Sequence, residues 1–362
     1  MKRHDVVIVG AGMAGASLAA ALAPHASVLM IEAESLPGYH ATGRSAAFWT
    51  ETYGGPGVQP LTSASGEFLR GGGFLKARGA LHIATEEDFA RLDRFVEAFA
   101  GSGIALTPLD GRSVADRVPG LRPGAWRGLF EASTTDIDVA ALHACYLREA
   151  KAAGAELVCS APLRCATREN GRWRIDAGEA LTVEAGTLVN AAGAWADEVA
   201  RIAGVAPLGI QPYRRTVAQL RVIPEASDTL PLVIDAAGRF YFKPEAGGRL
   251  WLSPHDETPT PPGDAAPEEI DVATAIDRME RVVDWTVERV ERSWAGLRSF
   301  APDRLPVYGF DVAVPGFFWF AGQGGFGIQT APAAARLGAA LLLGRAVEAE
   351  LDAGRYLPAR FA

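Results

Sequence analysis

A glycine-rich loop near the start of the chain constrains its fold more than any other stretch. Residues 5–9 form a short β-branched run typical of a strand buried on both faces, and residues 14–22 are good helix formers. The glycines between them have the spacing of a dinucleotide-binding loop: Gly10, Gly12 and Gly15. The next apolar run, residues 28–31, ends at Glu32, whose carboxylate can bind ribose hydroxyls. We therefore predict a βαβ unit that binds pyrophosphate at its helix N-terminus.

The same stretch has a second interpretation as a secretory signal. Basic residues at positions 2–4 precede an apolar run that ends in small residues. Three glycines would weaken an apolar signal helix, however, and Asp5 interrupts its start. A membrane span is disfavoured as well, because no polar flank or later apolar run supports it. We therefore expect a cytoplasmic protein without an integral membrane segment.

Composition and charge favour small-molecule partners over nucleic acid. The 362 residues are 49% hydrophobic and 22% charged, and the net charge is −8 without a basic stripe. The cysteines are too few and too irregularly spaced for a disulfide framework or a zinc site: Cys145, Cys159 and Cys165. We therefore expect inert thiols in a reducing compartment and no metal.

The remaining pattern predicts two kinds of domain. A hairpin signal lies at 169–171, and helical periodicity marks residues 61–70, 89–99, 139–153 and 270–283. Four β-rich segments between 213 and 252 have no intervening helices, which favours an antiparallel sheet. The chain ends with a strand at 316–321, a glycine loop at 322–327 and a helix at 328–343. We predict an α/β nucleotide domain from residues 1–50, 135–205 and 295–362, and an inserted antiparallel-sheet domain from residues 51–134 and 206–294.

Eight motifs in a fixed order carry a family resemblance. They are VVIVGAGMAGAS, PGYHATGRSAA, TDIDVAALH, VNAAGAWAD, QPYRRT, FYFKPEAG, WAGLRSFAPD and AGQGGFGIQT. Their order resembles the flavoprotein family of D-amino-acid oxidases, sarcosine oxidases and related dehydrogenases, and most of all its D-arginine dehydrogenase-like D-amino-acid dehydrogenases. The resemblance implies an α/β (α+β composite) fold: a Rossmann-type FAD-binding domain with an inserted antiparallel-sheet substrate domain.

The resemblance also implies which residues bind FAD. It assigns Glu32 to the adenosine ribose and the backbone of Leu163 to the adenine. The pyrophosphate side comprises Gly10, Gly12, Ala14, Gly15 and Gly193, and the flavin side comprises Thr42, Gly43, Arg44, Ser45 and Ala46. The isoalloxazine loop comprises Gly322, Gly324, Gly325, Phe326, Gly327, Ile328 and Gln329. A glycine loop that opens a helix offers free N–H groups to negative charge on a reduced flavin, worth about 0.3–2 kcal/mol.

The mode of FAD attachment follows from the same motifs. His40 lies where some relatives attach the flavin through a histidine, but its surroundings resemble the non-covalent subgroup. No cysteine follows Cys165 to serve as another anchor. We therefore expect non-covalent FAD, with His40 as a hydrogen-bonded loop residue.

Two arginines and two tyrosines match the family's substrate residues. Arg298 and Arg215 match arginines that hold a substrate carboxylate, and a guanidinium fork can orient the Cα–H toward the flavin. Arg298 lies in an otherwise apolar stretch, so its charge needs a partner. Tyr53 and Tyr241 match tyrosines that contact the substrate, although Tyr241 also fits the pattern of an ordinary sheet aromatic. The implied reaction transfers hydride from Cα of a neutral amine to flavin N5, and water then hydrolyses the imine.

Specificity is predicted from departures from the arginine-oxidising relatives. Phe48 replaces a histidine and Gly79 replaces an acidic residue that faces the substrate guanidinium, while Leu232 and Ile234 make the pocket more apolar. The pocket residues are therefore Phe48, Gly79, Leu232, Ile234 and Gln329. An unpaired cation buried there would cost several kcal/mol. We expect a D-amino acid, or a related imino or N-alkyl acid, with an apolar or small side chain.

Three rival functions stay open at this stage. A flavin-dependent 2-hydroxy-acid dehydrogenase would also use Arg298 but would need a base near the hydroxyl group. A non-catalytic FAD-bearing subunit would bind the cofactor without turnover. An NAD-dependent dehydrogenase fits the terminal glycine loop less well. The electron acceptor, quinone or oxygen, does not follow from residue types.

Overall fold

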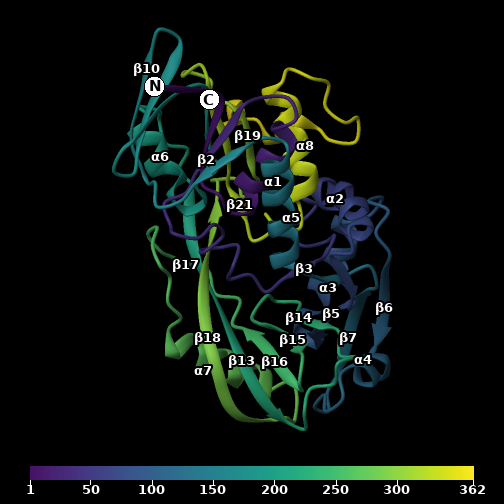
Figure 1. The fold of residues 1–362 in the computed structure, drawn as a ribbon. Coiled ribbons are helices and arrows are strands. Elements are labelled where there is room, and N and C mark those ends of the chain that lie inside the picture. Colours follow the sequence, from purple (N-terminus) through teal and green to yellow (C-terminus); the bar gives the residue numbers. More distant parts are fainter.

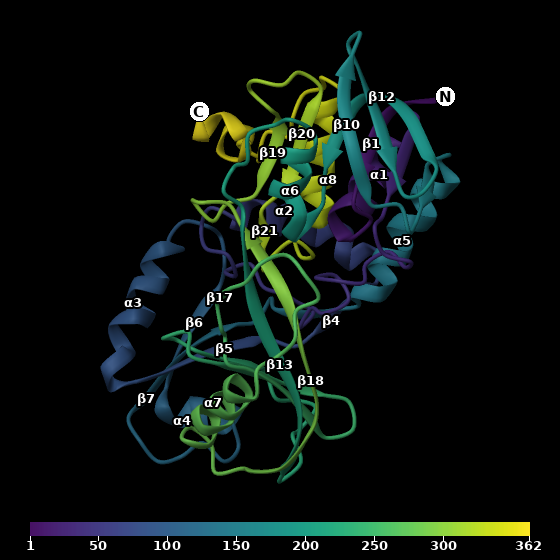
Figure 2. The same cartoon turned by 90° about the vertical axis from the view of Figure 1, so that its left-hand side faces the viewer.

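The computed structural model describes residues 1–362 as two lobes, each built around one large sheet. In Figure 1 the first sheet and its helices form the upper lobe, which holds both termini. The second sheet forms the lower lobe. Figure 2 shows the strand β18 (Thr286–Phe300) running from the bottom of the lower lobe into the upper one.

The first sheet has the order β10-β11-β12-β1-β2-β9, and β20 pairs with both β12 and β19. Its central strands are parallel, and the paired segments Val6–Val9 and Val28–Ile31 are apolar, as expected for strands buried on both faces. The bounds are β1 (Lys2–Val9), β2 (Val28–Ile31), β9 (Glu156–Val158), β10 (Leu163–Glu169), β11 (Arg172–Ala177), β12 (Leu181–Asn190), β19 (Val307–Phe310) and β20 (Phe317–Ala321). This sheet positions the first glycine loop at the carboxyl end of β1.

Helices cover both faces of the first sheet. One face packs on α1 (Met13–Leu22) and α8 (Ala331–Leu342), and α5 (Val139–Ala152) lies against α1. The other face packs on α6 (Ala196–Ile202). Asp138 accepts a hydrogen bond from the Ala141 amide and so caps α5, as its sequence position predicts.

The second sheet has ten strands, in the order β21-β18-β13-β16-β15-β14-β5-β7-β6, with β17 paired to β13. The helices α4 (Gly111–Arg117) and α7 (Glu269–Glu280) cover one face, and α3 (Phe89–Ala98) packs near β5. The strands are β5 (Ala80–Thr85), β6 (Leu106–Asp110), β7 (Trp126–Glu131), β13 (Gln211–Ile223), β14 (Leu232–Asp235), β15 (Tyr241–Glu245), β16 (Arg249–Ser253), β17 (Thr258–Pro259), β18 and β21 (Gln323–Gly324). Its other face looks toward the upper lobe.

A small sheet and one helix join the lobes. The strand β8 (Thr135–Ile137) pairs with β3 (Phe48–Trp49) and with β4 (Leu75–Ala77). The helix α2 (Gln59–Gly71) contacts α8, and its Leu61 belongs to the upper core. Because the prediction placed residues 51–134 in the lower domain, α2 is a departure from it.

Several predicted elements are observed and two differ. The hairpin at 169–171 forms, with Asn170 and Gly171 at φ 50° and 80° as a tight turn requires. The last helix begins at Ala331 rather than 328, because residues 327–330 form a turn. The predicted domain boundary at residue 295 falls inside β18, which is one continuous strand.

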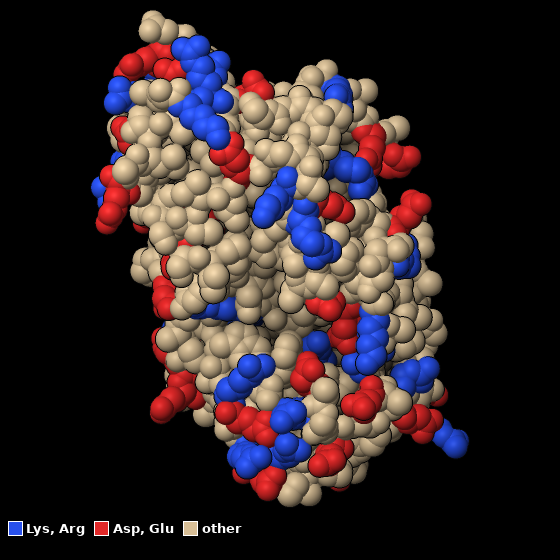
Figure 3. Space-filling view, viewed as in Figure 1, with Lys and Arg blue, Asp and Glu red and all other residues tan.

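The surface carries charged side chains of both signs (Figure 3). On the face in Figure 3, basic and acidic side chains are intermixed, and neither sign forms a continuous patch. No helix has the length and apolar character needed to cross a bilayer. The three cysteines are free.

Candidate active site

A cavity of about 440 Å³ lies along the carboxyl ends of the upper strands and reaches β18 of the lower sheet. Its walls come from segments far apart in the sequence. They include residues 9–10, 12–14, 31–34, 38–42, 44–45, 161–163, 191–195, 263, 265, 296–299, 323–325 and 327–328. The carboxyl edge of such a sheet is where this architecture binds nucleotides.

The first glycine loop is shaped for a close backbone approach. Gly10 has φ 100°, and a Cβ there would lie 2.6 Å from the Ala191 carbonyl oxygen. A Cβ on Gly15 would lie 1.9 Å from the Gly10 oxygen, so neither position tolerates a side chain. Thr42 Oγ1 accepts a hydrogen bond from the Met13 amide at 2.9 Å and fixes the start of α1 against the loop at 38–45.

Glu32 connects the end of β2 with this loop. Its carboxylate accepts hydrogen bonds from the Ala11 amide at 2.8 Å and the Glu34 amide at 3.0 Å, and it borders the cavity. His143 donates to the Ala11 carbonyl at 2.9 Å, and burial lowers the pKa of this histidine. The carboxylate therefore both supports the loop and faces the place where a ribose would bind.

His40 also lines the cavity. Its Nε2 lies 2.9 Å from Glu34 Oε1, and its ring packs on Trp195 with centroids 4.6 Å apart. The carboxylate and the indole together hold the imidazole at the cavity wall.

The second glycine loop closes the other end of the cavity. A Cβ on Gly324 would lie 2.2 Å from the Phe300 ring, and a Cβ on Gly325 would lie 2.2 Å from the Tyr53 hydroxyl. The loop therefore packs tightly against β18 and against the turn that carries Tyr53. A side chain at either position would displace Phe300 or Tyr53, so this packing requires glycine.

Arg298 is the strongest electrostatic feature of the cavity. It is 7% exposed, borders the cavity and forms no ion pair with any carboxylate of the chain. Burial lowers the pKa of its guanidinium, with a contribution from the nearby Arg215. By contrast, Arg215 bonds to Glu257 at 3.0 Å and to the Asp256 carbonyl at 2.8 Å. A buried guanidinium without a counter-ion is the natural site for an incoming carboxylate.

An aromatic cluster lies beyond Arg298, on the upward face of the second sheet. Phe48 packs edge-on against Tyr53 and Tyr241, with ring centroids 5.4 and 5.8 Å apart. Leu232 and Ile234 belong to the same apolar cluster as Tyr241. Tyr53 and Tyr241 lie near enough to Arg298 to influence the charge of its guanidinium, and none of these aromatic and apolar residues borders the cavity itself.

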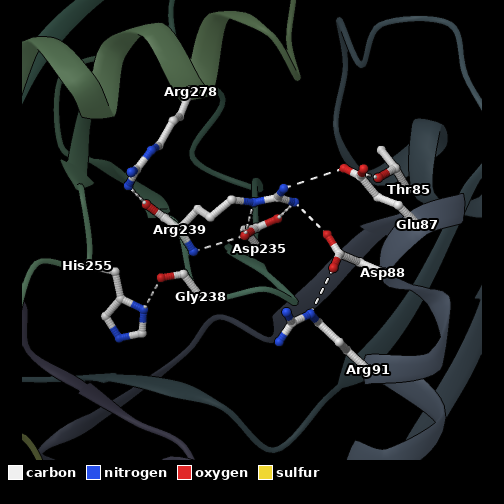
Figure 4. A network of polar contacts seen from close by, with 9 residues as sticks. All are labelled: Thr85, Glu87, Asp88, Arg91, Asp235, Gly238, Arg239, His255 and Arg278. Carbon is white, nitrogen blue, oxygen red and sulfur yellow. Dashed lines mark hydrogen bonds and ion pairs between the residues drawn. The ribbon is translucent and has the colours of Figure 1, made fainter.

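His255 is a residue of this region that sequence reasoning missed. Its ring packs edge-on against Tyr241 at 5.7 Å, and its Nδ1 donates to the Gly238 carbonyl at 3.0 Å (Figure 4). Burial, reinforced by the charge of Arg215, lowers the pKa of His255 to about 3. The imidazole is therefore neutral at pH 7, and its Nε2 is a hydrogen-bond acceptor. The residue lies in a Pro- and Asp-rich stretch that resembles a plain surface loop, so no pattern marks it.

The structure divides the predicted residues into two groups. Those that border the cavity are Gly10, Gly12, Ala14, Glu32, Thr42, Arg44, Ser45, Leu163, Gly193, Arg298, Gly324, Gly325, Gly327 and Ile328. Those that lie behind or beside it are Gly15, Gly43, Ala46, Gly322, Phe326, Gln329, Arg215, Tyr53, Tyr241, Phe48, Gly79, Leu232 and Ile234. The second group supports the walls or forms the aromatic side of the site.

Two predicted pocket residues need correction. Gly79 has φ 75°, and a Cβ there would meet the Phe130 ring at 2.7 Å, so a side chain at this position would not point into the pocket. Gln329 is buried, and its amide nitrogen donates to the Tyr53 carbonyl and to Thr62 Oγ1. The amide is thus used within the protein and does not face a substrate.

The donor set fits FAD. The first loop presents close backbone and a helix N-terminus for a pyrophosphate, Glu32 borders the cavity where a ribose would bind, and the second glycine loop borders the other end of the cavity. An elongated cavity that joins both loops matches a long dinucleotide better than a mononucleotide.

Comparison with known proteins agrees with this fit. Glycine oxidase of Pseudomonas aeruginosa is 34% identical over 179 residues, which is 47% of this chain and 44% of that protein. L-2-hydroxyglutarate dehydrogenase of Salmonella houtenae is 26% identical over 58% of this chain and 53% of that protein. The chain thus matches only about half, or less, of the length of these curated relatives.

Among solved structures, L-proline dehydrogenase from P. horikoshii superposes with a TM-score of 0.87 at 21% identity, over 99% of this chain and 98% of that one. This likeness concerns the fold. The model of the DAO family, described as FAD dependent oxidoreductase, matches residues 5–341. The chain therefore belongs to the DAO family of FAD-dependent oxidoreductases.

Proposed function

We propose that the protein oxidises the Cα–N bond of a D-amino acid, or of a related imino or N-alkyl acid, with an apolar or small side chain. The observation that carries the proposal is Arg298, a buried cation without a counter-ion at the flavin end of the cavity. The D configuration rests on the sequence resemblance alone. FAD, when bound, supplies the acceptor for the hydride.

The side chains around Arg298 have separate tasks in this proposal. Arg298 binds the substrate carboxylate through its guanidinium fork and so fixes the orientation of Cα. Arg215, already paired with Glu257, adds positive potential without being the primary ligand. Tyr53, Tyr241 and Phe48 form an aromatic wall that keeps water away from the reacting carbon.

The walls also set the side-chain preference. Phe48, Leu232 and Ile234 offer no carboxylate to a cationic side chain. Burying an unpaired guanidinium or ammonium there would cost several kcal/mol. We therefore expect D-arginine and D-lysine to be poor substrates.

An anaerobic substrate screen tests the proposal. Each acid, in both configurations, is added to the FAD-loaded protein, and loss of the visible flavin absorbance is followed. We expect reduction by small or apolar D-amino acids or N-alkyl glycines. A clear preference for D-arginine, or reduction by no amino acid at all, would contradict the proposal.

Oxidation of a 2-hydroxy acid is a second candidate, and the likeness to L-2-hydroxyglutarate dehydrogenase favours it. An alcohol must lose its proton, so this function needs a base near the hydroxyl group. His255 is poorly suited to that role, because a pKa of about 3 makes its imidazole a weak proton acceptor at pH 7. Matched pairs of amino and hydroxy acids decide between the two functions.

A further inference from the structure

The turn that carries Tyr53 is held by two buried side chains from distant parts of the chain. It comprises residues 50–53 and lies between β3 and α2. From the upper lobe, Gln329 accepts from the Thr50 amide at 3.3 Å and donates to the Tyr53 carbonyl at 3.1 Å. From the lower lobe, Glu131 at the end of β7 contacts the middle of the turn.

Both oxygens of Glu131 are used on this turn. Oε1 accepts a hydrogen bond from the Glu51 amide at 2.8 Å, and Oε2 accepts one from the Thr52 hydroxyl at 2.6 Å. The short second distance is typical of a hydroxyl that donates to a carboxylate. Two bonds to adjacent residues fix the position and the direction of the turn.

Burying the carboxylate of Glu131 costs free energy, because the group loses its hydration. It is 0% exposed and pairs with no Lys, Arg or His. Burial raises its pKa, and the neighbouring Glu51 also disfavours its charge. An apolar residue would avoid this cost, so stability alone does not explain a carboxylate at this position. The carboxylate instead fixes the conformation of residues 51 and 52 through its two hydrogen bonds.

That geometry decides where Tyr53 lies. The Tyr53 hydroxyl packs against Gly325 of the second glycine loop, and its ring contacts Phe48 and Phe326. A shift of the turn would therefore move the ring relative to the flavin loop and to Arg298. Glu131 is the one side chain of the lower lobe that accepts a hydrogen bond from the Glu51 amide or from the Thr52 hydroxyl.

We propose that Glu131 is a positioning residue that sets Tyr53 against the substrate through the amide of Glu51 and the hydroxyl of Thr52. This inference rests on the proposed function, in which Tyr53 forms part of the substrate wall. Glu131 itself touches neither the cavity nor the reacting atoms.

The test uses the FAD-loaded enzyme and variants at both ends of the contact. Glu131→Gln replaces one of the two acceptor oxygens with an NH2 donor, and Thr52→Val removes the hydroxyl while keeping the shape. Thr52→Ser restores the hydroxyl and serves as the rescue. Asp88→Asn is the matched control, because Asp88 is a buried carboxylate of the same lobe that pairs with Arg91 and Arg239, away from the turn (Figure 4).

We expect KM for the substrate to rise about tenfold in Glu131→Gln and Thr52→Val, as for the loss of a hydrogen bond to a charged group. The change in kcat should be smaller, and Thr52→Ser and Asp88→Asn should keep the wild-type KM. Amide hydrogen exchange of residues 50–54 should become faster in the first two variants only. The FAD dissociation constant should stay within about twofold in all four, because Glu131 does not border the cavity.

Two results would overturn the inference. One is an unchanged KM in both Glu131→Gln and Thr52→Val, and the other is a failure of Thr52→Ser to restore it. Either result, obtained with a wild-type enzyme that turns over, leaves the proposed function intact. If no acid reduces the wild-type flavin, the proposed function falls and this inference falls with it.

Discussion

At the scale of single residues, the two arginines of the site differ in their partners. Arg215 has a carboxylate and a carbonyl within hydrogen-bond distance, whereas Arg298 has no anionic partner. The family resemblance put Arg298 first and Arg215 second, but it could not show that Arg215 is paired, because the partner Glu257 comes from a segment that resembles a surface loop. This pairing is a contact that only folding creates.

Replacing these arginines should therefore have unequal effects. Arg298→Met should lower kcat/KM about a hundredfold, since it removes a charged hydrogen-bond pair worth about 1.5–3 kcal/mol. Arg215→Met should have a smaller effect and should weaken thermal stability, because it leaves the Glu257 carboxylate without that partner. Steady-state kinetics and thermal melts measure both. Equal losses of kcat/KM in the two variants would refute the ranking.

His82 gives a prediction about pH. It is buried against Phe95, and burial lowers its pKa to about 4. In the unfolded chain it takes up a proton near pH 6.5, whereas the folded protein takes it up only near pH 4. Stability must therefore fall as the pH drops from about 6.5 toward 4.

Thermal melts at pH 7 and pH 5 check this expectation. His82→Gln should reduce the loss of Tm between the two pH values relative to the wild type, because glutamine takes up no proton. His25→Gln is the control, since His25 is exposed and has no such burial. An equal loss of Tm in wild type and His82→Gln would contradict the argument.

The sequence predicted the role of the glycines in the first loop better than it predicted the direction in which individual side chains point. The positions of Gly10 and Gly15 follow from spacing, because any Cβ there clashes with backbone. The sequence predicted that residue 79 faces the substrate pocket, whereas a Cβ on Gly79 would point at the Phe130 ring. Direction depends on the sheet face, which the pattern around residue 79 does not fix.

At the scale of elements, residues 254–268 connect β16 with α7 and form part of the cavity wall. We call this segment the strap. Arg214 pairs with Asp256 near its start and with Glu268 and Asp271 at its end. At its tip, Asp264 pairs with Arg44. The sequence showed a Pro-rich surface excursion, and only the structure shows that Gly263 and Ala265 line the cavity.

Opening the strap should release FAD faster. Asp264→Asn removes an exposed ion pair, which solvent screens strongly, so the dissociation rate should rise only modestly, about two- to fivefold. Arg44 and the neighbouring Tyr39 lower the pKa of Asp264, so the contact is present at neutral pH and is lost only as the pH falls below the ordinary carboxyl range.

FAD release after dilution, followed by flavin fluorescence, measures this effect. Acid should accelerate release in the wild type and have less influence in Asp264→Asn. Asp277→Asn breaks an exposed pair on α7 that is remote from the cavity, and it should behave as wild type. Identical release rates in all three proteins would rule out a retaining role for the strap.

Element prediction succeeded where the local signal was strong. The turn at 169–171 has residues suited to positive φ, and the paired segments Val6–Val9 and Val28–Ile31 of the parallel strands are apolar. The strand β18 was not predicted, since adjacent charged residues occupy its exposed first half at 288–289 and 291–292. Its pairing with β13 makes it a strand despite its polarity, and such tertiary stabilisation is invisible in a local window.

At the scale of the whole molecule, the site is assembled from segments that are distant in the sequence. The family resemblance predicted their association in one FAD site, whereas local patterns could not have done so. Neither the resemblance nor the local patterns predicted which of these residues line the cavity and which support its walls. That distinction depends on the direction in which each residue faces in the complete fold.

FAD should stabilise the protein as one cooperative unit. Both lobes contribute to the cavity, and β13 and β18 pair along thirteen register positions. FAD at a hundred times its dissociation constant should add about 2.7 kcal/mol to the free energy of unfolding. Calorimetry should show a single transition that moves to higher temperature. Two transitions, with only one moved by FAD, would show that the lobes unfold independently.

The continuous strand β18 has a mechanical consequence. Its 15 residues span about 50 Å, and Arg298 lies near the upper end. Because β13 pairs with it along thirteen register positions, bending the strand between the lobes would strain ladder hydrogen bonds. Near its upper end the strand also pairs with the second glycine loop, at Ser299 and Gly324. Under the proposed function, Arg298 would therefore keep its position relative to this loop while substrates enter and leave.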